Sequence, residues 1–381
     1  MASNEQLQMN PDIAKFLLER GGTLIVTDVP PGTDFGIDFK SWTTGDNFKG
    51  IKMLPPGLHF IHYSAVSSEY NEMSPRVGFF HIFHEREFLV KKWDNKDEGI
   101  SAEDIDEEVV NRFKCNLKNL DKFLGPYPYD TWKEWQKLTS KIDDELIKRC
   151  QPLCGYVRAA LELENCDDNS RPRGSEINKK RKRGSGLSIE AQEELLLPTL
   201  KPKPGTELRL TELPDKTYPD NATPTEITQH SLDTSYALNI VIEKLKQPLE
   251  IIGELQLSFI CFLVGQSLDA FDHWKKLIAL ICGADKLIPN RRAIYIEFLR
   301  IIEIQLSHVP EDMLCDIVAN NNFVYHHLRK LFANIEMNME IDGKLKSEAK
   351  RLRERITETL MWDFTHLEEE EDDEAPVIVS L

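Results

Sequence analysis

The chain of 381 residues carries 47 Lys and Arg against 64 Asp and Glu, a formal net charge of −17 at pH 7. Seven of the acidic residues fall in the run 368–374, which leaves a charge of −10 on the rest. This balance repels phosphate backbones and anionic bilayers, so it argues against sequence-specific nucleic-acid binding and against a membrane-surface protein.

The start of the chain resembles no signal peptide, and no apolar run approaches the roughly 18–20 residues of a membrane span. We therefore expect an intracellular protein without a membrane partner. Its seven cysteines are scattered and are expected to be reduced thiols, several of them in the core.

A helix and a set of short strands are the first predicted elements. The pattern predicts a helix over residues 11–20, then strands at 23–29, 58–63, 76–83 and 87–93. Pro-Pro-Gly turns at 30–32 and 55–57 separate them, and an acidic surface loop is expected at 94–106. Short strands with Gly and Pro turns predict a β-sandwich or a barrel.

Two helices are expected to complete this β-rich domain, whose predicted extent is residues 1–154. Residues 107–124 carry apolar side chains at helical spacing, and Gly125 is expected to cap that helix. A second helix is expected to begin at a cap formed by Asp130, to carry Trp132 and Trp135 on its apolar side, and to end near residue 148.

Residues 155–205 are predicted to form a flexible linker. The polar stretch 165–186 has few large apolar side chains, so burial cannot offset the entropy lost on ordering it. A basic run within it is a candidate nuclear localisation signal, and a solvated charge cluster is the alternative. The run consists of Lys179, Lys180, Arg181, Lys182 and Arg183.

An all-helical domain is predicted for residues 206–365, after a short strand at 207–212. Thr223, Pro224 and Glu226 form a capping box that starts a helix running to about residue 246. Apolar periodicity predicts further helices at 249–264, 268–282, 290–307, 311–318, 322–336 and 343–360. Their short connections favour antiparallel pairs stacked into a bundle or short solenoid.

The last 16 residues, 366–381, form a predicted tail. The acidic run 368–374 repels itself and keeps the chain extended, and an apolar, β-prone segment follows at 375–381. Such a segment can fold back on its own β domain or add a strand to the exposed sheet edge of a partner. The alternative is a frayed terminus without a binding role, and the sequence slightly favours docking on a partner.

Metal-binding and catalytic patterns are weak. His59 and His62 are three residues apart, as are His81 and His84, so each pair points to opposite faces of a strand and predicts structural histidines. No phosphate-binding loop or nucleophile elbow is present. We therefore assign no catalytic, cofactor or metal residues.

One cluster of acidic and histidine residues suggests acid–base chemistry, and a solvent-exposed helix face is the alternative that we expect. Asp269, Asp272 and His273 are expected to lie on the solvent side of a helix whose apolar side holds Phe271 and Trp274.

Five blocks of sequence, in order, resemble the Aar-two family, the splicing factor family named for a1–alpha2 repression. The blocks are residues 35–64; residues 125–129 with Trp132 and Trp135; residues 222–228; residues 253–256 through 270–275; and residues 362–364 with 375–379. The resemblance covers most of the chain except about residues 155–200.

The resemblance implies a two-domain α+β fold, with a β-sandwich-like N-terminal domain and a C-terminal helical domain similar to VHS domains. It implies a non-enzymatic assembly chaperone of the U5 small nuclear ribonucleoprotein, found in nucleus and cytoplasm. Such proteins hold the large U5 core splicing protein before a helicase joins, and their tail strand bridges its RNase H-like and Jab/MPN domains. Carried over to this chain, that strand comprises Pro376, Val377, Ile378, Val379 and the terminal Leu381.

Two other classes of function stay open at this point. One is a generic adaptor that binds peptides through a VHS-like helical domain, which loss of binding on domain deletion would favour. The other is a hydrolase that uses His and Asp residues at the domain junction, which requires a concave site with convergent polar groups.

Overall fold

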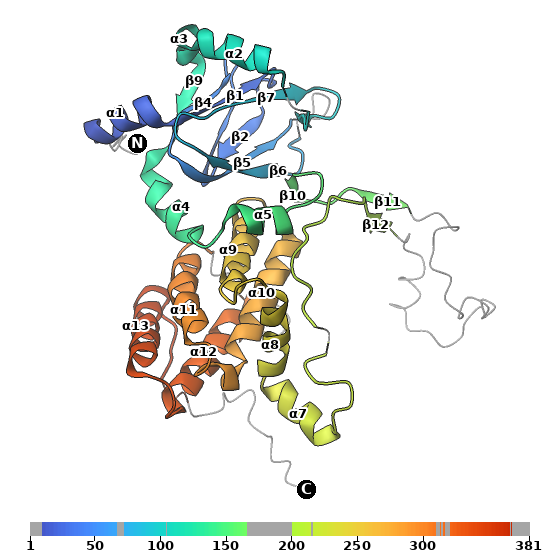
Figure 1. Ribbon diagram of the computed structural model, residues 1–381, viewed down its shortest axis with the longest axis vertical. Coiled ribbons are helices and arrows are strands. Elements are labelled where there is room, and N and C mark those ends of the chain that lie inside the picture. Colours follow the sequence, from blue (N-terminus) through green and yellow to red (C-terminus); the bar gives the residue numbers. More distant parts are fainter. Residues whose placement is uncertain are drawn as a thin grey trace, which may run out of the picture.

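The computed structural model describes residues 10–66, 72–103, 105–165, 200–214, 216–309, 313, 315–316, 321–365 and 367. A β-rich N-terminal region lies at the top of Figure 1, and a helical C-terminal region lies below it. The predicted two-domain α+β fold is therefore confirmed.

The N-terminal region contains two sheets, each five-stranded over the described residues. One has the order β8-β7-β1-β4-β9, and the other has the order β10-β6-β5-β2-β3. The first comprises β1 (Gly22–Thr27), β4 (Gly50–Leu54), β7 (Phe88–Asp94), β8 (Gly99–Ile100) and β9 (Leu124–Pro126). The second comprises β2 (Asp34–Ile37), β3 (Lys40–Thr43), β5 (Gly57–Ser64), β6 (Val77–Phe83) and β10 (Val157–Arg158). Predicted strands at 23–29, 58–63, 76–83 and 87–93 correspond to β1, β5, β6 and β7.

Alternation along β1 explains how its sheet is covered on both faces. Leu24 and Val26 belong to the main core cluster, which includes side chains of the second sheet. Ile25 points the other way and packs with Val90 and Leu124 in a smaller cluster. Helix α2 (Glu107–Cys115) and helix α3 (Leu117–Leu120) lie over this outer face, as Figure 1 shows.

Helix α1 (Pro11–Arg20) has its predicted bounds, but two other helices of this region are shorter than predicted. The stretch 107–124 breaks at Asn116 into α2 and α3, followed by the single turn η1 (Asp121–Phe123). Gly125 was predicted to cap this helix and instead lies in β9, which pairs with β4. The helical stretch ends before residue 124 because β9 is an edge strand that pairs with β4.

The helix predicted from Asp130 to about residue 148 is two helices, α4 (Trp132–Leu138) and α5 (Asp144–Cys150), preceded by the turn η2 (Tyr129–Thr131). Asp130 caps nothing and forms an ion pair with Lys40 instead. Asp143 caps α5 through its side chain. The break follows from contacts with the helical region that local sequence does not reveal.

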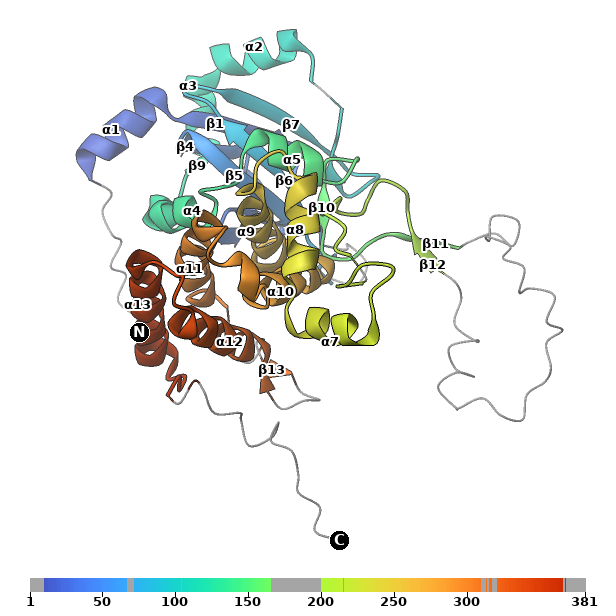
Figure 2. The ribbon, with the colours of Figure 1, turned by 60° about the horizontal axis from the view of Figure 1, so that its bottom comes forward.

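The helical region surrounds one buried helix, α9 (Glu250–Leu263). Nearly every side chain of α9 is buried, and it packs against α5, α10 and α11. Figure 2 shows it in the middle of this group. The other helices are α7 (Pro224–Leu232), α8 (Ser235–Lys244), α10 (Leu268–Cys282), α11 (Arg292–Leu306), α12 (Phe323–Met337) and α13 (Gly343–Leu360), with the turn η3 (Asp285–Leu287).

Helices α10 and α13 have their predicted bounds, and α9, α11 and α12 lie within two residues of theirs. The helix predicted to run from Thr223 to about residue 246 breaks at Asp233 and Thr234. These two side chains bond to other elements: Asp233 accepts from the Asp285 N–H, and Thr234 donates to the Leu280 carbonyl. Tertiary hydrogen bonds replace one helical turn here.

Two smaller predictions are wrong. Residues 207–212 form no strand, and the predicted helix 311–318 contains strand β13 (Cys315–Asp316), which pairs with β14 (Asn321–Asn322). Within the predicted linker 155–205, β10 joins the second sheet, and β11 (Leu163–Asn165) pairs with β12 (Leu200–Pro202). Residues 166–199 lie outside the described residues, so the linker stays a prediction.

Across the part of the chain that the structure describes, no helix combines the length and the apolar character that a membrane crossing requires. The described cysteine side chains, Cys115, Cys150, Cys154, Cys261 and Cys282, are free thiols, and three of them are buried.

Candidate functional site

The residues predicted to bind a partner or an import receptor lie outside the described residues. These are the tail strand at 376–379 with Leu381, and the basic run 179–183. Both assignments stay predictions. The structure does describe the surfaces next to the tail and the junction between the two regions, and these are the candidate sites.

The segment that leads into the tail packs on α12. After α13, Met361 adopts a left-handed conformation with φ 58° and reverses the chain. The ring of Phe364 then lies 5.1 Å from those of Tyr325 and Phe332 of α12, measured between centroids. The Tyr325 hydroxyl donates to the Asp363 carbonyl at 2.5 Å, and Leu367 packs against the core. The segment that precedes the tail, including Asp363 and Phe364, is therefore packed on this helix.

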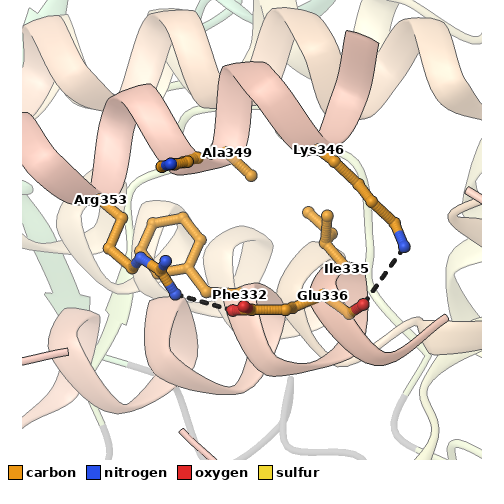
Figure 3. A pocket seen from close by; sticks show the side chains of 7 residues that line it. Phe332, Ile335, Glu336, Lys346, Ala349 and Arg353 are labelled. Atoms are coloured by element: carbon orange, nitrogen blue, oxygen red, sulfur yellow. Dashed lines mark hydrogen bonds and ion pairs between the residues drawn. The ribbon is translucent and has the colours of Figure 1, made fainter. Parts of the chain in front are cut away.

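A groove runs between α12 and α13, and we call it the α12–α13 groove. Figure 3 shows the ring of Phe332 and the side chain of Ile335 between the two helices, with charged side chains at both ends. The Glu336 carboxylate accepts from Arg353 at 2.8 Å, and the Lys346 amine donates to the Glu336 carbonyl at 3.2 Å. The lining residues are Phe332, Ile335, Glu336, Lys346, Ala349, Lys350 and Arg353, and the volume of the groove is about 160 Å³.

The domain junction is centred on Glu254 of α9, whose side chain is 2% exposed. It accepts from Arg149 of α5 at 2.9 Å and from His273 of α10 at 2.9 Å. The backbone N–H and the hydroxyl of Thr211 donate to it at 2.6 Å and 2.7 Å. One carboxylate thus joins the β-rich region, the segment after the predicted linker, and two helices of the helical region.

The pKa of Glu254 reflects these donors. Burial by itself raises the pKa of a carboxyl group, but the hydrogen bonds from His273 and Thr211 outweigh it and lower the pKa to about 2. Glu254 is therefore ionised at neutral pH. Its negative charge is engaged by Arg149, His273 and Thr211 within the protein.

Two other residues of the same sequence block, Gly253 and Gln256, also act at this junction. At Gly253, a Cβ atom would lie 2.4 Å from the Lys141 carbonyl oxygen, so only glycine permits this approach of α9. The Gln256 amide accepts from the Lys141 N–H at 2.8 Å and donates to the Lys137 carbonyl at 3.0 Å. These contacts hold the turn between α4 and α5, and they explain why one long helix does not form there.

His273 was predicted to lie on the solvent side of α10, and this is wrong. Its side chain is 11% exposed and bonds to Glu254, whereas Asp269 and Asp272 are exposed as predicted. The helical wheel assigned His273 to the polar side, but the buried carboxylate of α9 provides a partner that the pattern of α10 alone does not show.

A second buried polar group ties the first two sequence blocks together. The Asp38 carboxylate accepts from Tyr127 at 2.6 Å and contacts His59 at 2.7 Å. The other ring nitrogen of His59 lies 2.8 Å from the Pro55 carbonyl, and the ring stacks on Trp132 at 5.0 Å. Because both nitrogens of this fully buried histidine have protein partners, it has no position for a substrate proton.

The other three histidines of this region differ in their surroundings. His62 is buried, and its Nε2 lies 3.2 Å from the Asp38 carbonyl. Burial and the nearby Arg76 charge lower the pKa of His62 to about 3, so it is neutral at physiological pH. His81 bonds to Glu87 at 2.7 Å, and His84 is exposed. Among the described residues, no three His, Cys, Asp or Glu side chains are grouped to hold a metal ion.

Sequence reasoning missed the functional pairing of Glu254, Arg149 and Thr211, and the pairing of Asp38 with Tyr127. One signal for the first was available. Glu254 and Gln256 interrupt the apolar run 251–264, and a charged residue inside such a run needs a buried partner. The identity of the partner cannot be deduced from the sequence because Arg149 lies 105 residues away.

Comparison with known proteins gives a consistent result over both regions. Residues 20–152 match the family model described as the AAR2 N-terminal domain, and residues 210–365 match that of the AAR2 C-terminal repeat region. The protein called "Protein AAR2 homolog" from Homo sapiens is 37% identical over 386 aligned positions, which cover 98% of this chain and 97% of the relative. The Mus musculus protein of the same name has the same values. The Caenorhabditis elegans protein of that name is 31% identical, covering 93% of this chain and 98% of the relative.

Proposed function

Because the chain belongs to the AAR2 family, we propose that it is a non-enzymatic assembly factor of the U5 small nuclear ribonucleoprotein in pre-mRNA splicing. In this proposal it binds the large U5 core splicing protein and delays the association of the helicase. The observation that carries the proposal is the extent of the match, since family models cover both folded regions and the reported relatives align over 93–98% of the chain.

The geometry of the junction supports a binding platform. Glu254 accepts hydrogen bonds from Arg149, His273 and Thr211, so its charge is used to hold the two regions together. A partner that contacts both regions would then meet surfaces in a fixed relative position, which lowers the ordering cost of binding.

The tail supplies a second, separable contact in this proposal. Pro376, Val377, Ile378 and Val379, with Leu381, add a strand between the RNase H-like and Jab/MPN domains of the partner, where backbone hydrogen bonds give affinity. Ordering the tail costs free energy and keeps the complex exchangeable. The acidic run 368–374 steers the tail toward a basic surface of the partner.

The proposed locations are the nucleus and the cytoplasm, with residues 179–183 as the import signal. Replacing these five basic residues with Ser would reduce nuclear accumulation of the fluorescently tagged chain. It would leave capture of the partner unchanged, which makes this variant a control for the experiment below.

A pull-down from nuclear and cytoplasmic extract tests the function. The bait is the full chain or a chain ending at Glu374. The proposal predicts that the full chain captures the large U5 core splicing protein and that truncation clearly reduces capture. Equal capture by both baits would indicate that the main interface lies in the folded regions and not in the tail. Absence of the partner from both would contradict the proposal.

A generic peptide-binding adaptor is the second candidate, and the α12–α13 groove favours it because its floor is apolar and its ends are charged. If the chain is such an adaptor, Ala349→Arg in the groove should abolish capture of the partner. Truncation of the chain at Glu374 should then leave capture unchanged. The hydrolase alternative has less support, since the polar groups at the junction bond to one another.

A further inference from the structure

The α12–α13 groove combines an apolar floor with basic side chains along one wall. Phe332, Ile335 and Ala349 form the floor, and each is less than 5% exposed, so the floor is narrow. Lys346, Lys350 and Arg353 line the α13 side, against the single carboxylate of Glu336 from α12. Figure 3 shows Lys346 and Arg353 at opposite ends, both directed toward Glu336. Such a groove fits a segment that carries both acidic and apolar side chains.

Helix α13 is basic in an acidic protein. It has six basic and three acidic residues, a net charge of +3 where the whole chain has −17. The basic residues are Lys344, Lys346, Lys350, Arg351, Arg353 and Arg355, and the acidic ones are Glu348, Glu354 and Glu358. Part of this charge is offset by ion pairs of Arg353 with Glu336 and of Arg351 and Arg355 with Glu303. The remaining positive field attracts an acidic segment.

The chain itself provides a segment of this composition next to the groove. Phe332 lines the groove, and its ring also contacts Phe364 at 5.1 Å between centroids. Leu367 packs against the core, and the seven acidic residues 368–374 follow at once, with the apolar residues 375–381 after them. The tail therefore begins at the groove and needs no long path to enter it.

The lengths also agree. Lys346 and Arg353 are seven positions apart, which corresponds to a rise of about 10 Å along α13. An extended run of seven residues reaches about 23 Å, so the acidic run spans the basic wall with length to spare. The remaining residues can then return over the apolar floor.

We propose that the α12–α13 groove holds residues 368–381 of the same chain when no partner is bound, so that the tail strand is sequestered. The acidic run lies along Lys346, Lys350 and Arg353, and the apolar end covers Phe332 and Ile335. This inference rests on the proposed function, in which the same strand docks on the core splicing protein. The groove and the partner then compete for the tail, which lowers the apparent affinity of the tail for any partner by the same factor.

A labelled peptide of residues 366–381 tests the proposal with full-length proteins. One protein is the unmodified chain, and the other is a full chain whose seven residues 368–374 are replaced by Gln. We expect the peptide to bind the Gln variant at least about tenfold more tightly, because its own tail no longer occupies the groove. Raising the salt from about 50 mM to about 500 mM should weaken this binding, since exposed charges are screened.

Matched substitutions on α13 identify the site. Added to the Gln variant, Lys350→Glu should remove most of the peptide binding. Lys344→Glu makes the same charge change at an exposed position that does not line the groove, and should have little effect. Both variants must keep the circular dichroism spectrum of the parent.

Two outcomes would overturn the proposal. The first is equal binding of the peptide to the unmodified chain and the Gln variant, or no binding to either. The second is a tenfold difference that depends on protein concentration and comes with a dimer in sedimentation, which would assign the groove to the tail of a second copy. Neither measurement includes the splicing partner, so failure here leaves the pull-down experiment to decide the proposed function separately.

Discussion

Arg149 of α5 donates a hydrogen bond of 2.9 Å to the Glu254 carboxylate of α9, and the two residues are 105 positions apart in the chain. The pair connects the β-rich region with the centre of the helical region. Removing one partner of a buried ion pair leaves the other charge uncompensated, which is far more costly than the pair itself is favourable.

The first prediction concerns this pair. Glu254→Gln should lower the free energy of unfolding by about 2–4 kcal/mol, because Arg149 and His273 lose a charged acceptor. Urea unfolding measures the change. The control is Glu243→Gln on the exposed face of α8, which should change stability by about 0.5 kcal/mol or less. Equal effects of the two substitutions would contradict the structural role of Glu254.

The second prediction is a pH dependence with a definite sign. The pKa of Glu254 falls from 4.5 in the unfolded chain to about 2 in the fold, so the unfolded chain binds its proton first. Its contribution, about 3 kcal/mol, is complete above pH 4.5 and is lost as the pH falls toward 2. The stability difference between the unmodified chain and Glu254→Gln should therefore shrink over this range. A difference that stays constant from pH 7 to pH 2 would refute the assignment.

The third prediction tests the close approach of α9 to the β-rich region. In Gly253→Ala the new Cβ meets the Lys141 carbonyl oxygen at 2.4 Å, and the backbone must move. We expect a loss of about 1–3 kcal/mol in thermal or urea unfolding. Gly343→Ala, at the first residue of α13 with no atom within 4 Å of the new Cβ, should be neutral or stabilising by up to about 1 kcal/mol. The opposite order would contradict the packing.

The fourth prediction addresses the buried group in the β-rich region. Burial raises the pKa of Tyr127 far above its usual value, so its hydroxyl keeps its proton and donates to Asp38 at 2.6 Å. Tyr127→Phe should cost about 1.5–3 kcal/mol, because a hydrogen bond to a charged group is lost in the interior. Tyr129→Phe, at a less buried position of the same sequence block, should cost about 0.5 kcal/mol or less. If both cost the same, the Asp38 contact contributes no net stability.

The local sequence pattern was sufficient to predict the elements whose bounds depend only on their own residues and caps. The β-branched, apolar run 23–29 predicts a strand, and in the structure Leu24 and Val26 are covered on one face and Ile25 on the other. Helix α10 has its predicted bounds because Ser267 caps its first turn and Gly283 follows its last residue. In these segments local propensity and tertiary packing favour the same structure.

The breaks between helices could not be predicted because distant side chains cause them. The amide of Gln256 binds the Lys141 N–H and separates α4 from α5. Thr234 bonds to the Leu280 carbonyl and separates α7 from α8. The junction could not be predicted for the same reason, since the partners of Glu254 come from three separate parts of the chain: Arg149, Thr211 and His273. The predicted tail strand and import signal lie outside the described residues, so they remain for experiment to test.

The most direct test of the central claim is the affinity for a purified protein that contains the RNase H-like and Jab/MPN domains of the large U5 core splicing protein. Isothermal titration with the full chain and with the chain ending at Glu374 measures it. The account predicts saturable binding by the full chain and at least about tenfold weaker binding after truncation, the loss expected for an added strand. No detectable binding by the full chain would contradict the proposed function.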